Sequence, residues 1–389
     1  MVTSRPARPW RRPMRPRRRD EPHRAATPLE LFFDLSFVVA ITQAAGELHD
    51  ALVADQVWHA VTSYLMVFFG IWWAWMNVTW FASAYDTDDD LYRLTTLVQV
   101  AGALILAAGV PQAFEGADYA TVTLGYVVMR LATVGNWLRA AANDPARRRT
   151  ALRFAAGVSG VQLGWLLRLL VPPALGPISF LTLAVADLLV PVVAERRAMT
   201  SWHPRHIAER YGLFALIVLG EVVLAIAMAV QTGVSSGDEW LWPLAGAGTA
   251  IVFALWWLYF DRPIQVPSSL RGALAWGYGH YGVFAGLGAV GAGLAVAVEH
   301  QHSPAEVDGL VAGYAVAVPV AVVLLVLWGL RMLPVRDRAR PVAVPLATAA
   351  VLLTPLTPAP VYLVAVVLVG LAATLRWPAT GSTASARRR

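Results

Sequence analysis

The sequence predicts an all-helical protein that crosses a membrane many times. Of its 389 residues, 57% are hydrophobic and only 14% are charged, whereas a soluble chain carries about 25% charged residues. Uncharged apolar runs recur along the whole chain, and each is close to the ~20 residues that a helix needs to cross a bilayer. Together these observations exclude a soluble globular protein. The chain has no cysteine, which excludes disulfides, thiolate metal sites and cysteine nucleophiles.

Twelve apolar runs are the candidate membrane spans. They cover residues 29–49, 56–82, 92–114, 119–141, 151–171, 175–194, 207–230, 240–260, 272–298, 309–330, 342–356 and 359–376. The eleventh run is short and three prolines crowd its end, which is typical of a broken or re-entrant segment. We therefore predict an all-α, polytopic integral membrane protein with about twelve transmembrane helices within residues 26–377. The tails, residues 1–25 and 378–389, are expected to be disordered.

Basic side chains predict the side of the membrane that each connection faces. All 31 basic residues are Arg, which excludes lysine Schiff-base chemistry and a P-loop lysine. Nine of them lie in residues 1–24, and with this tail inside, nearly all the others fall on the same side. The predicted outer connections carry acids instead: Asp50, Asp55, Glu115, Asp118, Asp238, Glu239, Glu299, Glu306 and Asp308. The positive-inside rule therefore places both termini in the cytoplasm. We expect the tail to contact solvent or anionic lipid, and no nucleic acid.

An internal repeat is suggested by two similar run starts. Glu30 opens the first run and Glu209 opens the seventh, and each is followed by an apolar, aromatic-rich stretch. Six spans separate the two starts, so both would have the same orientation, as in a parallel repeat. The spacing is consistent with a 6+6 architecture.

Two carboxylates lie inside apolar runs, where charged groups are rare. Asp34 belongs to the first run and Glu221 to the seventh. An acid within a membrane costs ~2.5–3.5 kcal/mol on insertion scales, so it marks a candidate functional site. Glu30 lies four residues before Asp34 and shares its helix face. Glu221 follows Glu209 by twelve residues, which at ~1.5 Å per residue places it ~18 Å deeper in the membrane.

The balance of buried charge motivates a proton-linked site. Asp187 is a third intramembrane acid, whereas Arg130 is the one arginine predicted to lie well inside a span. Arginine keeps its charge and would pair with one acid, which leaves two acids to bind protons or a cation. The alternative is a structural ion pair together with neutral acids that hold helices together by hydrogen bonds. His280 in the ninth run would join the site, unless it is a hydrogen-bonded core histidine.

Two further groups carry less specific signals. His206, Glu209 and Arg210 share a predicted helix start, where a capping or salt-bridge role is expected, and their spacing matches no zinc pattern. Four tryptophans crowd the second run, namely Trp72, Trp73, Trp75 and Trp80. They are interpreted either as part of an aromatic belt at the membrane interface or as a stacking surface for an organic ligand.

Three segments of the chain resemble the bacterial low temperature requirement protein A (LtrA) family. They are PLELFFDLSFVVAITQ at residues 28–43, WWAWMNVTW at residues 72–80, followed by YDTDDD and Arg93, and HIAERYGLFALIVLGE at residues 206–221. The resemblance covers roughly residues 28–230 and implies a multi-pass bacterial inner-membrane protein connected with growth in the cold, with no established substrate. The family's motif positions map onto Glu30, Asp34, Gln43, Asp86, Arg93, Glu209, Arg210, Gly220 and Glu221.

The leading hypothesis is a proton-coupled secondary transporter of a small solute or ion, without enzyme activity, cofactor or metal. Asp34 and Glu221 would bind the proton or the solute, Arg130 would be their counter-ion, and Glu30 and Glu209 would form a cytoplasmic gate. One alternative is a membrane-embedded enzyme that acts on lipid or a lipid-linked substrate, using the cluster at the start of the seventh run. Another is a non-transporting sensor or scaffold whose arginines bind anionic lipid.

Overall fold

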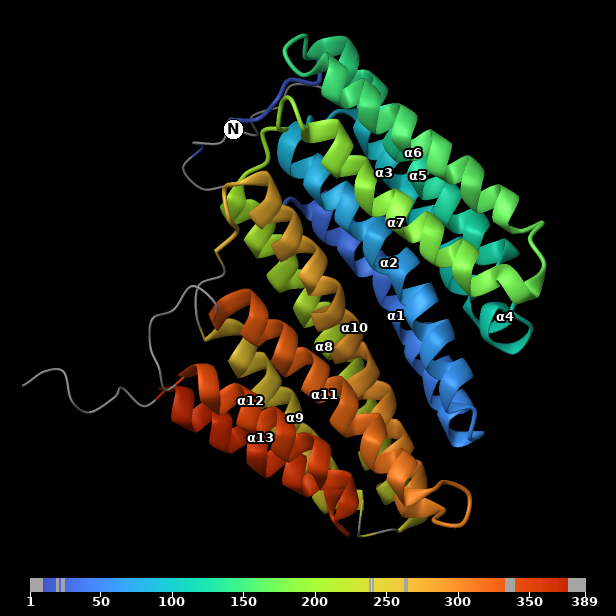
Figure 1. The fold of residues 1–389 in the computed structure, drawn as a ribbon, viewed down its shortest axis with the longest axis vertical. Helices are drawn as coiled ribbons and strands as arrows, with labels where there is room; N and C mark the ends of the chain where they lie inside the picture. Colours follow the sequence, from blue (N-terminus) through green and yellow to red (C-terminus); the bar gives the residue numbers. More distant parts are fainter. Residues whose placement is uncertain are drawn as a thin grey trace, which may run out of the picture. The chain divides into compact units, whose positions relative to one another are not determined.

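The computed structural model describes residues 10–18, 21, 25–237, 239, 241–261, 265–332 and 340–376, and these contain helices and no strand. The α-helices are α1 (Pro28–Val53), α2 (Val57–Tyr85), α3 (Asp90–Ala108), α4 (Val110–Glu115), α5 (Ala120–Asn143), α6 (Arg148–Arg168), α7 (Gly176–Glu195), α8 (Pro204–Ser236), α9 (Leu241–Phe260), α10 (Leu270–His302), α11 (Gly309–Met332), α12 (Arg340–Leu353) and α13 (Pro360–Arg376) (Figure 1). Two short 3-10 helices, η1 (Pro173–Leu175) and η2 (Thr354–Leu356), precede α7 and follow α12.

The predicted apolar runs all fall on helical segments, but only some of these helices are candidate membrane spans. In the described part of the chain, 8 helices are long and apolar enough to cross a membrane: α1, α2, α3, α7 with η1, α8, α9, α10 and α11. Helices α12 and α13 are apolar but shorter, and α5 and α6 carry arginines along their length. The structure therefore supports a polytopic helical membrane protein. Twelve spans and a 6+6 repeat stay predictions.

The third predicted run is divided into two helices. It ends as α3 at Ala108, and a separate helix, α4, begins after Gly109. Pro111 lies in the first turn of α4, where its missing N–H leaves no hydrogen bond unmade. Pro111 therefore fits the start of a new helix after Gly109.

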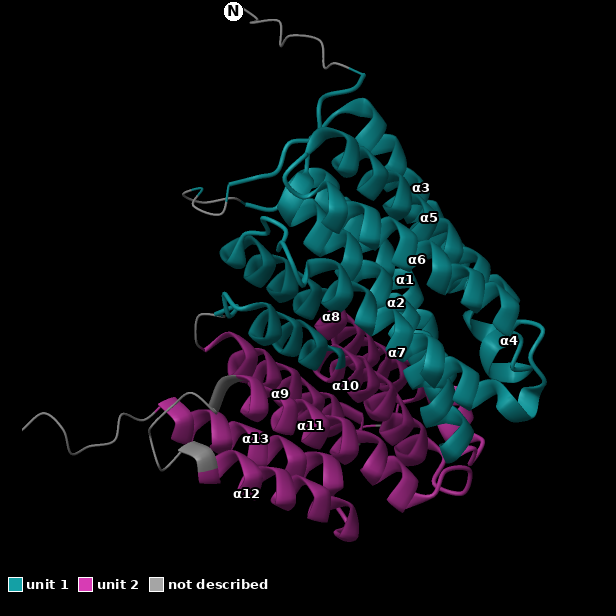
Figure 2. Ribbon diagram, turned by 45° about the horizontal axis from the view of Figure 1, so that its top comes forward, with its two compact units in different colours: residues 1–48, 57–217, 264–281 teal, residues 49–56, 218–263, 282–389 magenta. Residues whose placement is uncertain are grey.

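The described residues form two compact units, which are coloured separately in Figure 2. Unit 1 comprises Met1–Leu48, Val57–Ile217 and Ile264–Tyr281, and unit 2 comprises His49–Gln56, Val218–Pro263 and Gly282–Arg389. Helices α1, α8 and α10 contribute residues to both units.

Within unit 1, helices α3, α5, α6 and α7 pack in that order, each against the next (Figure 1). Glycine permits the closest of these contacts. A Cβ at Gly125 of α5 would lie 2.5 Å from the carbonyl oxygen of Gly102 and 2.8 Å from Leu106 Cα, both on α3. Small residues at such a crossing let two backbones approach, as is common between membrane helices.

Part of the N-terminal tail, residues 1–25, makes contacts with unit 1, and disorder of the tail stays a prediction. Residues 10–18, here called the N-terminal arm, lie against the α2–α3 connection of unit 1. Arg17 N donates to Ala84 O at 2.8 Å, and Leu91 N donates to Trp10 O at 3.2 Å. Met14 is fully buried in an aromatic core cluster that includes Trp137. Met14 is therefore an apolar anchor within an otherwise basic segment. Residues 1–9 and 378–389 lie outside the described part of the chain.

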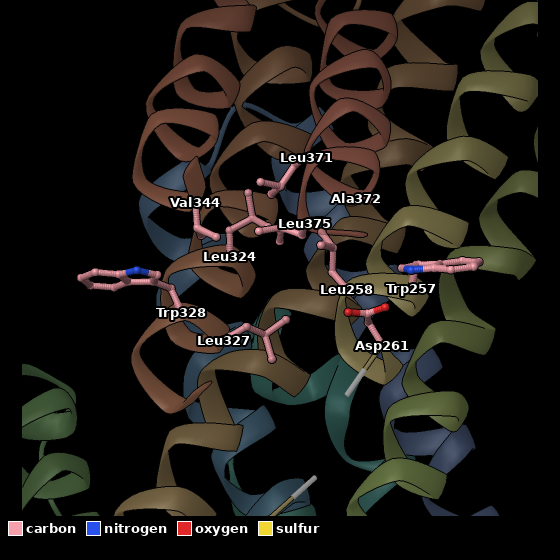
Figure 3. A pocket seen from close by; sticks show the side chains of 10 residues that line it. All are labelled: Trp257, Leu258, Asp261, Leu324, Leu327, Trp328, Val344, Leu371, Ala372 and Leu375. Carbon is pink, nitrogen blue, oxygen red and sulfur yellow. The ribbon is translucent and has the colours of Figure 1, made fainter. Parts of the chain in front are cut away.

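Unit 2 is built around α9, α11, α12 and α13. Helix α9 packs on α13, and α11 packs on α12. A pocket of about 570 Å³, counted with the space open to solvent, lies among these four helices (Figure 3). Leucines such as Leu324, Leu371 and Leu375 line it, and Asp261, just beyond the end of α9, supplies its acidic side chain. The pocket is mainly apolar.

Candidate functional site

A group of buried charged side chains in unit 1 joins the start of α1 to the start of α8. Arg210 of α8 donates to both carboxylate oxygens of Asp34 on α1, with Nε to Oδ2 at 2.9 Å. Trp75 of α2 donates its Nε1–H to Asp34 Oδ1 at 2.7 Å. Asp34 and Arg210 are at most 1% exposed. The two-point geometry is the strongest form of an arginine–carboxylate contact, and it fixes the relative rotation of the two helices.

Glu30 and His206 complete this group one helical turn away. Glu30 Oε1 lies 3.2 Å from Arg210 Nη1 and 3.2 Å from His206 Nε2. Glu30 also accepts a hydrogen bond from Thr27 N at 2.8 Å, while Glu30 N donates to Thr27 Oγ1. This reciprocal pair is a capping box, and Pro28 stands at the first helical position, where proline is favoured. The local sequence therefore both begins α1 and orients Glu30. Glu30, Asp34, His206 and Arg210 are called the α1–α8 cluster below.

The α1–α8 cluster brings together two carboxylates, one guanidinium and one imidazole. Arginine keeps its charge, whereas carboxylates and imidazoles can bind and release protons. Histidine is the side chain best suited to exchange a proton near neutral pH.

Sequence reasoning did not identify Arg210 as the partner of Asp34. It assigned Arg210 to a helix start outside the membrane interior and took Arg130 as the one arginine inside a span. The prediction that two buried acids lack an arginine partner is therefore corrected. A usable signal was present: Glu30 and Asp34 are four residues apart, and so are His206 and Arg210. Residues four apart share a helix face, and the structure pairs the two faces in register, with a separation of 176 positions in the sequence for each pair.

Arg130 and Asp187 form a second buried group in unit 1. Asp187 on α7 is fully buried and accepts hydrogen bonds from Tyr126 OH at 2.8 Å, Trp165 Nε1 at 2.9 Å and Arg130 Nη2 at 3.3 Å. This group links α5, α6 and α7. Asp187 is thus the acid that Arg130 pairs with, as in the structural ion-pair alternative. Among the described residues, Arg130 Nε and Nη1 have no hydrogen-bond partner.

The other predicted site residues occupy separate places. Gln43 of α1 is exposed, and Glu221 is half-buried in the unit 2 part of α8, where it contacts Gly291. The His280 ring packs on Trp276 with centroids 4.1 Å apart and hydrogen-bonds to Trp276 O, which is the arrangement of a core histidine.

Glu209 Oε1 accepts a hydrogen bond from Ala26 N at 3.1 Å, beside the Thr27 N–H that donates to Glu30. Glu30 and Glu209 therefore accept hydrogen bonds from neighbouring backbone N–H groups at the start of α1. Their role as a cytoplasmic gate stays a prediction.

A third charged group holds the N-terminal arm to the α2–α3 connection. Asp89 caps α3 by accepting from Tyr92 N at 2.7 Å, and it also accepts from Arg12 N at 2.7 Å and Arg139 Nη2 at 2.6 Å. Burial raises the pKa of Asp89, but these hydrogen bonds outweigh burial, so its pKa lies below the ordinary 3.8 of an aspartate. In the described residues, no group of three or more His, Asp or Glu could hold a metal ion.

Asp89 is expected to make stability depend on pH in the acid range. Because its pKa is lowered on folding, its contribution is present above pH 3.8 and is lost as the pH falls through the lower, folded-state value. Asp89→Asn should cost about 2 kcal/mol at pH 7, since it weakens charge-assisted hydrogen bonds. Melting temperatures are measured from pH 7 to pH 3. The difference in melting temperature between wild type and variant should become smaller below pH 4. A gap that is constant with pH, or an equal loss for Asp90→Asn, would contradict this assignment.

Comparison with known proteins places the chain in a family. The family described as bacterial low temperature requirement A protein (LtrA) matches residues 25–375. An uncharacterized protein of Rhizobium meliloti (strain 1021) is 28% identical over 241 residues, which are 59% of this chain and 57% of that relative's length. The family match includes both halves of the α1–α8 cluster and extends through unit 2, well beyond the region that the motifs alone indicated. The chain therefore belongs to the bacterial low temperature requirement A family and is a membrane protein with several apolar helices.

Proposed function

We propose that this protein is a proton-coupled secondary transporter of a small solute, and that the α1–α8 cluster binds the coupling proton. One observation carries the proposal: two carboxylates, one imidazole and one guanidinium, each at most 4% exposed, are in mutual contact within membrane-length helices. Ionisable groups in such a position are costly, and in membrane proteins they mark proton relays and ion pathways.

The architecture of the cluster suits a transporter in two further ways. It joins the first turns of two long helices, so a change in its charge would alter how these helices are held together. Protonation of Asp34 would remove the charged partner of a two-point contact with Arg210, whereas protonation of His206 would strengthen its contact with Glu30. A proton can therefore favour one helix arrangement over another, which is what coupling requires. Glu221, on the same helix α8, is proposed as a second proton-binding acid.

The proposed setting is the bacterial inner membrane, with both termini in the cytoplasm. The concentration of arginine in the connections on one side supports this orientation. There the proton gradient would supply the driving force. The proposal is for a carrier rather than an enzyme.

Neutralising Glu30 is expected to uncouple transport. In Glu30→Gln the charges of the remaining Asp34 and Arg210 cancel without a bound proton. An imposed pH gradient should therefore no longer drive accumulation of solute. The measurement uses the purified protein in proteoliposomes with a pH-sensitive dye inside and a panel of small solutes outside. We expect wild type to accumulate its solute about tenfold under a one-unit pH gradient, and Glu30→Gln and His206→Gln only to equilibrate it.

The matched control is Glu306→Gln, which neutralises an exposed carboxylate in the α10–α11 connection. It should behave as wild type. If both cluster variants accumulate solute as wild type does, the cluster is structural and the coupling assignment is wrong. If no solute in the panel moves with protons, the transporter proposal is wrong, and the result favours the lipid-sensor or scaffold alternative.

A further inference from the structure

Arg168, the last residue of α6, is a buried cation that has no acidic partner in the described part of the chain. It is 9% exposed, and its Nη2 donates to Gly176 O at 3.3 Å. Its Nε is buried and has no hydrogen-bond partner among the described residues. Buried polar groups are normally satisfied by protein, water or a ligand. Arg168 therefore offers a charged donor that these residues leave unused.

Three aromatic rings of unit 1 surround the Arg168 guanidinium. Its central carbon lies 4.8 Å from the ring centre of Tyr119, 5.6 Å from that of Phe180 and 6.0 Å from that of Trp165. Ring faces stabilise a cation by cation–π attraction. They do not replace the in-plane hydrogen bonds that the guanidinium N–H groups make. The rings thus hold the cation in a place that is poor in water, and its Nε donor is left for a further partner.

A small pocket in unit 1 is lined by Arg168 and by these three rings. Thr123 and Tyr126 of α5 and Gly70 of α2 also line it. The space within it is about 30 Å³, whereas one water molecule needs roughly 10–15 Å³ by such a measure. The pocket therefore has room for one or two water molecules or for one monatomic anion, which is little larger than water. It is too small for sulfate, phosphate or an organic solute.

The charges around this pocket favour an anion over a cation. Two of its lining residues, Trp165 and Tyr126, donate hydrogen bonds to the carboxylate of Asp187. That carboxylate is paired with Arg130 at 3.3 Å, so its negative charge is compensated. The positive charge of Arg168 is then left over. A cation would be repelled by it, and a water molecule would satisfy the donor without compensating the charge.

We propose that Arg168 and this pocket bind one monatomic anion, of which chloride is the common example. The anion would accept a charge-assisted hydrogen bond from Arg168 Nε, and the Thr123 hydroxyl would be a second donor. Since two hydrogen bonds from one cation and one hydroxyl form a modest site, we expect a dissociation constant of about 10 mM. This site goes beyond the transport function proposed above, because it lies apart from the α1–α8 cluster and its occupation requires no flux.

The test is binding of chloride to the purified full-length protein, which is first dialysed into sodium gluconate. Broadening of the chloride NMR signal reports binding in the millimolar range. We expect bromide to compete with chloride to within about threefold, because both are monatomic, and sulfate not to compete. Replacing gluconate by about 100 mM chloride at equal ionic strength should also raise the melting temperature by about 2 °C.

Three variants locate the anion. Arg168→Met removes the cation and should weaken chloride binding by about tenfold or more, whereas Thr123→Val keeps the shape, removes one hydroxyl and should weaken it by about threefold. The matched control is Arg149→Met, which removes an exposed arginine of the same helix and should bind as wild type does.

Four results would overturn the assignment. The first is a melting temperature and a chloride signal that do not respond to chloride, as expected if the pocket holds only water. The second is competition by sulfate equal to that by bromide, which would indicate a nonspecific surface effect. The third is unchanged affinity in Arg168→Met. If Arg168→Met does not fold, unchanged affinity in Thr123→Val takes its place as the contradicting result.

Discussion

Arg210→Met is expected to lower the free energy of unfolding at pH 7 by about 3–5 kcal/mol, because it leaves two buried carboxylates without their cation. Glu30 and Asp34 both contact this guanidinium, and neither reaches bulk solvent. Burial of a charge without a partner is among the largest penalties that one substitution can cause. Unfolding of the purified protein in mixed micelles by increasing denaturing detergent gives the measurement.

Two comparisons test this explanation. The triple variant Arg210→Met, Glu30→Gln, Asp34→Asn buries no net charge and should recover at least half of the loss. Arg93→Met removes another arginine, whose ion pair with Asp88 is part-exposed, and should cost less than about 1 kcal/mol. A triple variant as unstable as the single one would show that arginine packing, and not charge compensation, stabilises this region.

Gly125→Ala should lower the free energy of unfolding by about 3 kcal/mol, at the upper end of the range for overpacking. The added methyl group would meet the backbone of α3, at Leu106 and at the carbonyl oxygen of Gly102. A side chain could turn aside, but backbone atoms move only if α3 and α5 separate along their length. The same unfolding measurement applies, and a cross-link between α3 and α5 would report the separation directly.

Gly135→Ala is the matched control on the same helix. A Cβ at Gly135 would meet no atom within 4 Å. Alanine is the better helix former by about 1 kcal/mol, so this change should be neutral or stabilising. Equal effects of the two substitutions would mean that helix propensity, rather than the α3–α5 contact, governs both positions.

The two buried charge groups give the structure different kinds of rigidity. Asp187 receives three hydrogen bonds and connects three consecutive helices, α5, α6 and α7. The α1–α8 cluster connects helices that are far apart in the chain, and its Glu30 contacts both His206 and Arg210. The first arrangement suits a fixed scaffold. The second contains groups that can exchange a proton, and it is therefore where we propose that function lies.

The sequence by itself determined the helical class, the apolar runs and the buried acids. Each of these depends on local properties, because a run of about 20 apolar residues has few alternatives to a helix in lipid. The start of α1 was also encoded locally, since the stretch from Thr27 to Glu30 contains both partners of a capping box and a proline between them.

Only the tertiary structure decided which charges meet. The partner of Asp34 lies 176 residues away, and its choice depends on how α1 and α8 are rotated and shifted against each other. Hydropathy carries almost no information about that rotation, because lipid and the protein interior are both apolar. The same reason applies to the N-terminal arm, whose Met14 packs among side chains from helices that are distant in the chain. Local composition thus specified the helices, while packing between helices specified the site.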